Sequence, residues 1–302
     1  MRSRLGVASA LLLIAVAPAA AATSGFAFLE VPVGARAAAL GGAFTSLSDG
    51  AESMFWNVAG VSATKKLEVT ASHSELLLNL RHEGFAVAFP AMGGGLGASV
   101  RALYTEPITE RDELGNEIGT FGSHDLEFSI AHGRKIGEAF SAGVSAQIVR
   151  ERIASYSTTT WSVGFGGGWS PPSLPGVRAA LAVEHLGPAA HYDIAGSQGD
   201  PVELPAAVQG GFSYSRELQA VTLRGGLEGR WTSGRTGIGM LGAELDHSSG
   251  AALRAGYRAN DDATTFSAGA GWRNAQLALD YAWVPYQLDL GDAHRFSITA
   301  RF

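Results

Sequence analysis

The sequence of 302 residues contains no cysteine, which excludes disulfides, thiolate catalysis, Cys-ligated zinc and iron–sulfur clusters. Charged residues make up only 17% of the chain, against about 25% in soluble domains. With three lysines and a net charge of −6, a dedicated nucleic-acid-binding protein is not expected. Beyond residue 22, no run of 18 or more apolar residues predicts a transmembrane helix. Only a β-barrel would then cross a membrane.

Glycine is abundant instead. Forty of the 302 residues are glycine, close to twice the usual share of about 7%. Because glycine is unfavourable in helix interiors, a mainly helical protein is not expected. The apolar fraction of 46% is too high for a disordered chain, and the mean hydropathy is slightly positive at +0.10. This composition is typical of β-structure in a membrane.

The first 22 residues have the pattern of a secretory signal peptide. Arg2 and Arg4 precede the apolar run 5–17, and an alanine tract ends at Ala22. Cleavage after Ala22 leaves 280 residues and, since two arginines are lost, a net charge of −8. The alternative is an N-terminal membrane helix, for which the apolar run is short. We therefore expect an exported protein.

From Leu67 to the last residue, the sequence alternates between two kinds of residue. In the segment 277–283, Leu, Leu, Tyr and Trp alternate with Ala, Asp and Ala. Successive strand residues face opposite sides, so each such segment has one apolar face and one polar or tiny face. A soluble β-sandwich shows the same period. The fourteen expected strands are 67–75, 83–90, 95–104, 123–132, 138–150, 158–169, 176–186, 206–215, 219–231, 238–247, 251–259, 263–273, 275–284 and 294–302.

The lengths of the connections favour a membrane barrel over a sandwich. The long connections, 105–122, 187–205 and 285–293, are the third, seventh and thirteenth, all odd in number. The even connections are mostly tight turns. Transmembrane barrels have short periplasmic turns and longer outer loops, and their strand number is even. We predict an all-β fold, a 14-stranded antiparallel transmembrane β-barrel over residues 67–302.

The C-terminus supports this prediction. The last expected strand alternates, with Phe296, Ile298 and the final Phe302 on one face. An aromatic last residue on such a strand resembles the assembly signal of outer-membrane barrels. The resemblance implies recognition by the barrel assembly machinery and a location in the outer membrane, in contact with its lipid.

The segment before the first strand has a different character. Its alanine-rich start and the stretch 49–57 favour short helical turns over strands. Three stretches resemble the PorV/PorQ family, which belongs to the FadL-like group of fourteen-stranded outer-membrane barrels. They are Phe28-Leu-Glu-Val-Pro32, Gly34-Ala-Arg-Ala-Ala-Ala-Leu-Gly-Gly-Ala43 and Trp56-Asn-Val-Ala-Gly60, where Val58 replaces the proline that is usual after the asparagine.

This resemblance implies that residues 23–66 form a short helical plug in the mouth or lumen of the barrel. Fourteen strands enclose more space than their own inward side chains fill, so a plug is physically reasonable. The residues that carry the motif are Gly34, Arg36, Gly41, Gly42, Asp49, Trp56, Asn57 and Gly60.

Charged residues of both signs fall on the inward strand faces. We therefore expect ion pairs within the lumen and between wall and plug, with Arg36 meeting an inward carboxylate rather than solvent. The inward charged residues are Glu68, Arg101, Asp125, Glu127, Arg178, Glu184, Arg224, Glu228, Arg230, Glu244, Arg254, Asp280, Arg295 and Arg301.

Enzyme signatures are weak or missing. The stretch 237–242 fits the dinucleotide pattern G-x-G-x-x-G, but it opens an alternating strand rather than a helix. No G-x-S-x-G, H-E-x-x-H or P-loop occurs, and eight histidines are scattered without metal-ligand spacing. The acidic stretch 110–117 fits a solvated outer loop better than a calcium site. We expect no enzymatic activity, cofactor or metal, with a barrel lipase as the remaining enzymatic alternative.

Three functions remain. The resemblance implies a non-enzymatic barrel that shuttles or attaches cargo in type IX protein secretion. Its partners would be secretion-system proteins or exported cargo, and the outer loops 105–122 and 187–205 would be its functional parts. The alternative is a FadL-like outer-membrane transporter of hydrophobic molecules, with an apolar pocket behind the plug and a lateral gap between strands. A secreted soluble β-protein is disfavoured by the connection pattern and Phe302. Glycine and charge on the inward faces favour the secretion role.

Overall fold

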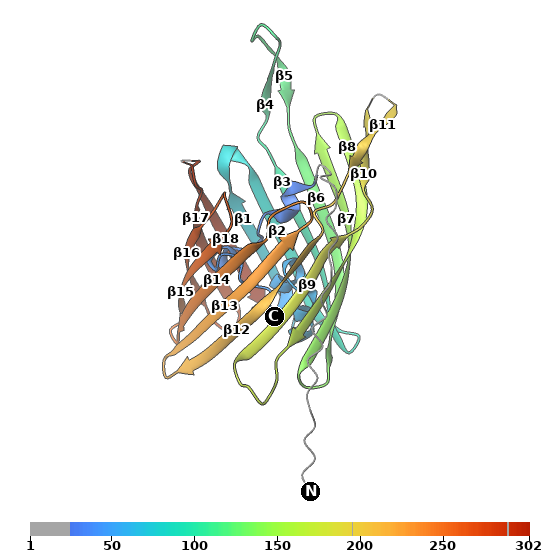
Figure 1. Ribbon diagram of the computed structural model, residues 1–302. Coiled ribbons are helices and arrows are strands. Elements are labelled where there is room, and N and C mark those ends of the chain that lie inside the picture. Colours follow the sequence, from blue (N-terminus) through green and yellow to red (C-terminus); the bar gives the residue numbers. More distant parts are fainter. Residues whose placement is uncertain (1–24, 195, 289) are drawn as a thin grey trace.

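The chain forms a closed antiparallel β-barrel in the computed structural model, which describes residues 25–194, 196–288 and 290–302 (Figure 1). The predicted signal peptide, 1–22, lies outside the described residues. The fourteen barrel strands are Glu68–Glu75 (β1), Arg81–Ala91 (β2), Gly94–Tyr104 (β3), His124–Ile136 (β6), Phe140–Ile153 (β7), Tyr156–Trp169 (β8), Val177–Leu186 (β9), Ala207–Leu218 (β12), Val221–Thr232 (β13), Ile238–His247 (β14), Ala251–Ala259 (β15), Phe266–Arg273 (β16), Leu277–Pro285 (β17) and Asp292–Arg301 (β18).

The predicted fourteen-stranded antiparallel barrel is therefore confirmed. Neighbouring strands in the barrel are also neighbours in chain order, and β1 closes the barrel against both β2 and β18. At the seam between the first and last strands, Glu68 pairs with Arg301 and Glu75 pairs with His294. The alternating residue pattern thus identified every barrel strand, with differences only at the strand ends.

Two short hairpins correct the predicted loops 105–122 and 187–205. Within these connections β4 (Ile108–Arg111) pairs with β5 (Glu117–Phe121), and β10 (Ala190–Ile194) pairs with β11 (Ser197–Val202). Both hairpins extend beyond the same end of the barrel, and β4–β5 projects farthest (Figure 1). Most of their residues are exposed on both faces, so they carry no alternation to reveal them. We call the end that bears these hairpins the outer end.

The two faces of the barrel wall differ sharply in polarity. On β6, Phe128 and Ile130 on the outside are 57% and 66% exposed, whereas the inward Glu127 and Ser129 are buried. The same alternation of exposed apolar and buried polar side chains recurs around the barrel. A continuous apolar exterior of this size is the surface that a barrel presents to lipid. This is why charge is scarce in the sequence.

Short helical segments precede the barrel. They are η1 (Ala27–Glu30), α1 (Ala35–Ala39), η2 (Gly50–Phe55) and η3 (Val58–Ala63), and a further turn, η4 (Leu77–Asn79), links β1 to β2. Among the described residues, no helix has the length and apolarity needed to cross a membrane. The helical turns expected near residues 49–57 are present.

The last strand is placed as an assembly signal requires. Phe296 and Ile298 point outward on β18, and the exposed Phe302 follows it, its backbone N–H donating to the carbonyl of Leu67 over 2.9 Å. The role of these side chains in assembly stays a prediction.

Replacing Phe302 with alanine should lower the amount of assembled barrel in the outer membrane, because the outward aromatic ring at the closing strand is lost. The measurement is the fraction of outer-membrane protein that migrates faster on a gel before boiling than after it. Phe302→Tyr, which keeps the ring, is the matched control. Equal assembled fractions for Phe302→Ala and the native chain would show that this residue is not a signal.

Candidate functional site

The residues before β1 form a plug inside the barrel. This plug segment, residues 25–66, begins at the outer end, where the N–H of Phe26 donates to Glu151 over 2.8 Å. It descends through α1 to the opposite, inner end. There the two Nη atoms of Arg178 donate to the two carboxylate oxygens of Asp49, over 2.8 and 2.7 Å, in a bidentate ion pair. It then turns back through η2 and η3 before entering β1 (Figure 1).

The plug packs against small residues of the wall. Phe44, Trp56 and Val61 of the plug are buried in one apolar cluster with Ala86 and Ala88 of β2. Inward glycines allow closer approach still. A Cβ on Gly256 would lie 2.1 Å from the backbone nitrogen of Gly41, and one on Gly143 would lie 2.6 Å from the carbonyl carbon of Val58. Larger residues at these wall positions would therefore clash with the plug backbone.

Arg36 is held by a carboxylate of the wall. Its Nε and Nη2 donate to the two oxygens of Glu244 on β14, over 2.8 and 2.9 Å. Arg224, Arg254 and Arg273 donate to the same carboxylate, over 2.9, 2.6 and 3.3 Å. The side chain of Glu244 is fully buried, so its charge is compensated entirely by these guanidinium groups. This is the contact expected of Arg36, and it fixes α1 to β14 and β15.

A second carboxylate holds the loop after α1. Glu228 of β13 accepts hydrogen bonds from the backbone N–H groups of Thr45 and Ser46, over 3.0 and 2.8 Å, and from the hydroxyl of Ser46. Gln209 of β12 donates to the same carboxylate over 3.0 Å. The sequence placed Glu228 on an inward face, but two of its partners are backbone N–H groups, which residue types do not reveal.

Gly41 and Gly42 allow the turn between these two anchors. Both have positive φ, 66° and 84°, a conformation that other residues adopt with strain. Both also lie tightly against the wall, since a Cβ on Gly42 would meet Arg258 and Met240 at 3.1 Å. The motif residue Gly34, with φ of 91°, precedes α1 in the same way.

Asn57 and Trp56 connect the second half of the plug, η2 and η3, to the wall and to the first half of the plug. The Asn57 side chain accepts from the N–H of Ala59, at the start of η3, and donates to the carbonyl of Gly167 on β8, both over 3.1 Å. The indole of Trp56 donates to the carbonyl of Val33 over 3.0 Å. Val58 is the first residue of η3, a position where proline also fits, which explains how valine replaces it.

Gly60, the last residue of the motif, allows two plug turns to touch. A Cβ at Gly60 would lie 2.6 Å from the carbonyl oxygen of Ser48. The motif residues thus serve the internal architecture of the plug and its attachment to the wall.

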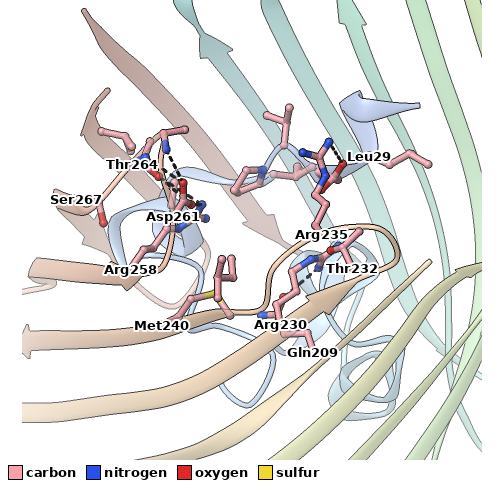
Figure 2. A pocket seen from close by; sticks show the side chains of 18 of the residues that line it. Leu29, Gln209, Arg230, Thr232, Arg235, Met240, Arg258, Asp261, Thr264 and Ser267 are labelled. Carbon is pink, nitrogen blue, oxygen red and sulfur yellow. Dashed lines mark hydrogen bonds and ion pairs between the residues drawn. The ribbon is translucent and has the colours of Figure 1, made fainter. Parts of the chain in front are cut away.

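A cavity of about 620 Å³ lies at the outer end, between the plug and the wall (Figure 2). Its plug side is mostly apolar, with Leu29, Val31 and Phe55, and also includes Glu30. Its wall side comes from β12 to β18 and from the turns 233–237 and 260–265. We call this cavity the outer pocket. Of the motif residues, only Trp56 lines it.

Arginines distinguish the wall of the outer pocket from an apolar channel. In Figure 2, Arg230 lies beside Gln209, and Arg258 lies against Asp261. Burial opposes the ionisation of Asp261, but Arg258 and backbone donors hold the pKa of this carboxyl below its usual range. The pocket is also lined by the acidic residues Glu30, Glu184, Asp261 and Asp262, so apolar surface and charges of both signs meet in one cavity. The arginines that line it are Arg101, Arg230, Arg235, Arg258 and Arg295.

The transporter hypothesis predicted an apolar pocket and a lateral gap. A pocket is present, but its lining is both apolar and charged. It lies at the outer end, between the plug and the wall, rather than behind the plug. The barrel is closed, and among its described strand pairings the register shifts only between β8 and β9. There His185, with φ of 58°, turns a buried side chain into the lumen and hydrogen-bonds Glu127 over 3.1 Å.

The chain matches the uncharacterised protein family UPF0164 over residues 4–164, more than half of its length. The chain belongs to the UPF0164 family. No curated protein matches this UPF0164 member. The PorV/PorQ resemblance stays a prediction.

Solved structures of outer-membrane channels share the fold of this UPF0164 member. The CymD monoaromatic hydrocarbon channel has a TM-score of 0.60 at 13% identity, covering 90% of this chain and 98% of CymD. The Pseudomonas putida toluene transporter TodX has a TM-score of 0.59 at 10% identity, covering 89% of this chain and 96% of TodX. A Pseudomonas aeruginosa FadL homologue has a TM-score of 0.56 at 13% identity, and the match covers 90% of this chain and 98% of the homologue. These similar structures are channels rather than enzymes.

Replacing Glu244 with glutamine should loosen the plug, because four arginines then lose the carboxylate between them. Breaking such a buried ion pair costs about 3–5 kcal/mol. We expect a matching fall in the free energy of unfolding in urea and faster proteolysis within residues 25–66. Glu217→Gln, at the exposed inner end of β12, is the control. Unchanged stability and proteolysis would show that the wall holds the plug by packing alone.

Proposed function

We propose that this protein is an outer-membrane channel that takes up small molecules with a large apolar part. The outer pocket carries the proposal. It opens at the end that bears the two hairpins, and its volume of about 620 Å³ suits a small organic molecule. The plug supplies its apolar side and the wall supplies orienting polar groups. The fold shared with the hydrocarbon channels CymD and TodX supports the same assignment.

The plug is the gate in this proposal. Below the outer pocket, the apolar cluster around Phe44, Trp56 and Val61 fills the lumen. A molecule in the pocket therefore passes inward only when part of the plug moves. The ion pair of Arg36 with Glu244 and the backbone contacts to Glu228 define the closed position. Moving the plug breaks these contacts, so they stabilise the closed position.

Locking the plug with a disulfide should stop uptake. The chain has no cysteine, so an introduced pair has no competitor. Ala43 and Gly226 suit it, because the Cβ of Ala43 lies 3.6 Å from where a Cβ on Gly226 would lie, within the disulfide range of about 3.5–4.5 Å. We expect the oxidised double variant to abolish channel-dependent uptake of toluene or hexanol across the outer membrane of intact cells, and a reductant to restore it.

The two single-cysteine variants control for the substitutions themselves. If the oxidised double variant transports as fast as its reduced form, passage does not require movement of the plug near Ala43. The gating proposal would then be wrong.

A second candidate function is the accessory role in type IX protein secretion. One observation favours it: the β4–β5 hairpin projects well beyond the barrel (Figure 1) and exposes Ile108, Leu114 and Ile118, apolar residues that a protein partner would cover. In this proposal the hairpin holds exported cargo or a subunit of the attachment machinery.

Replacing residues 107–120 with a short turn separates the two functions. We expect the variant to keep full uptake of hydrophobic molecules, since the outer pocket lies away from this hairpin. If the protein serves secretion, the same variant should leave type IX cargo unattached at the cell surface. Normal cargo attachment, or a source genome without type IX components, would count against the secretion role.

A further inference from the structure

The outward face of β6, β7 and β8 changes abruptly in polarity near the outer end, where β7 turns into β8 (Figure 1). Toward the middle of the barrel this face is apolar, and Phe128, Ile148 and Trp161 are each more than half exposed. After Ile148, the next two outward residues of β7 are Arg150 and Arg152, both exposed. Tryptophan at the border of apolar and charged surface is typical of the membrane interface. The two arginines therefore lie at the level of the lipid headgroups.

The strand register places further hydrogen-bond donors beside these arginines. Arg150 pairs with Thr159 of β8, and Arg152 pairs with Ser157. On β6, His124 lies opposite Arg152, because the register of β6 and β7 continues in an isolated bridge beyond it. Directly opposite residues share a face of the sheet, and the Cα atoms of the two arginines lie about 6.6–6.8 Å apart along the strand. We call these five residues the rim patch.

The charges of the rim patch are not balanced by the protein. No carboxylate of the described residues lies within ion-pair distance of Arg150 or Arg152. The carboxylates nearest to them in the strands, Asp125, Glu127 and Glu151, point into the lumen. The outward faces of β6, β7 and β8, which the structure describes throughout, thus carry cations without anions.

Outward charges near the outer end of β1 and β2 are arranged differently. There His73 hydrogen-bonds Glu83 over 2.7 Å, and Arg81 pairs with Glu106 over 2.8 Å. These groups have partners within the chain, whereas the rim patch has none of opposite charge. Two neighbouring guanidinium groups at headgroup level favour an anion from outside the protein. Guanidinium groups match phosphate in particular, because they donate two parallel hydrogen bonds to it.

The surface next to the rim patch suits acyl chains. Phe128 of β6 pairs with Ile148 of β7, and Ile148 pairs with Trp161 of β8, so one apolar row crosses all three strands beside the arginines. Ile130 and Phe165 extend this exposed apolar surface toward the middle of the barrel. A molecule that matches both surfaces has a phosphate at one end and long apolar chains at the other. Lipids have this form, and soluble phosphate compounds match only the charged part.

We propose that the rim patch binds the phosphate of an outer-leaflet lipid whose acyl chains lie on the apolar face of β6, β7 and β8. The site is on the exterior of the barrel, separated by the wall from the outer pocket, so it does not depend on the proposed channel function. A lipid held there fixes the depth of this side of the barrel in the membrane. It also lies beside β6, the strand that follows the β4–β5 hairpin.

Lipid binding to the purified full-length protein in detergent tests this site. Dioleoyl phosphatidate and dioleoylglycerol, which differ only by the phosphate, are titrated separately, and the bound fraction is measured by native mass spectrometry. We expect phosphatidate to bind at least about tenfold more tightly, because charge-assisted hydrogen bonds are the stronger ones. Equal affinities would overturn the phosphate site. Glycerol phosphate, a headgroup without chains, is the third compound, and binding as tight as that of phosphatidate would overturn the assignment to a lipid.

Variants identify the residues. The double variant Arg150→Gln/Arg152→Gln should weaken phosphatidate at least about tenfold and leave dioleoylglycerol unchanged. The matched control is Arg134→Gln/Arg216→Gln, which removes the same charge from exposed outward positions at the inner ends of β6 and β12. An equal loss in both double variants would show that binding follows net charge alone, and the site would be wrong.

Heat-modifiable migration verifies that each variant is a closed barrel. The comparison of phosphatidate with dioleoylglycerol on the native chain stands even where a variant fails to assemble.

Discussion

The fit of the plug backbone against glycines of the barrel wall is the constraint on which the structure depends. A wall of fourteen strands with small inward residues leaves a lumen that its own side chains do not fill. At Gly143, Gly166 and Gly256 a single added carbon would collide with the plug backbone. The abundance of glycine is therefore a requirement of the interior. The apolar exterior is the separate requirement of the lipid.

Charge specifies the position of the plug within that space. Apolar packing against alanine and glycine is non-directional and would tolerate a small slide or rotation of the plug. Glu244 and Glu228 remove this freedom, because one receives guanidinium groups from plug and wall together and the other receives two consecutive backbone N–H groups. The outer pocket lies where such pairing is incomplete. Four of its five arginines have carboxylate partners: Arg101 pairs with Glu127, Arg230 with Glu184, Arg235 with Glu30 and Arg258 with Asp261. Arg295 donates instead to the carbonyl of Pro32 in the plug.

Local patterns predicted the barrel, and long-range contacts explain what they left out. Alternation with period two identified every barrel strand, because each strand separates lipid from lumen. The hairpins β4–β5 and β10–β11 have no such separation and were predicted as loops. Arg36 is a lone arginine in an Ala/Gly segment, and this predicted an ion pair for it. Its partner Glu244 lies 208 residues away in the sequence, so a local pattern could not identify it. The outer pocket draws on residues from Ala27 to Arg295, so only the closed barrel creates it.

The hydrogen bonds of the plug to β18 couple the two ends of the chain. Ser297 accepts from the backbone of Ala35, and Arg295 donates to the carbonyl of Pro32, while β18 itself closes the barrel against β1. Residues before the barrel and residues of its closing strand thus stabilise one another. Contacts of such sequence separation form late and slowly. A chain without β18 would lack both the seam and these contacts to the plug, so the barrel closes only once β18 is present.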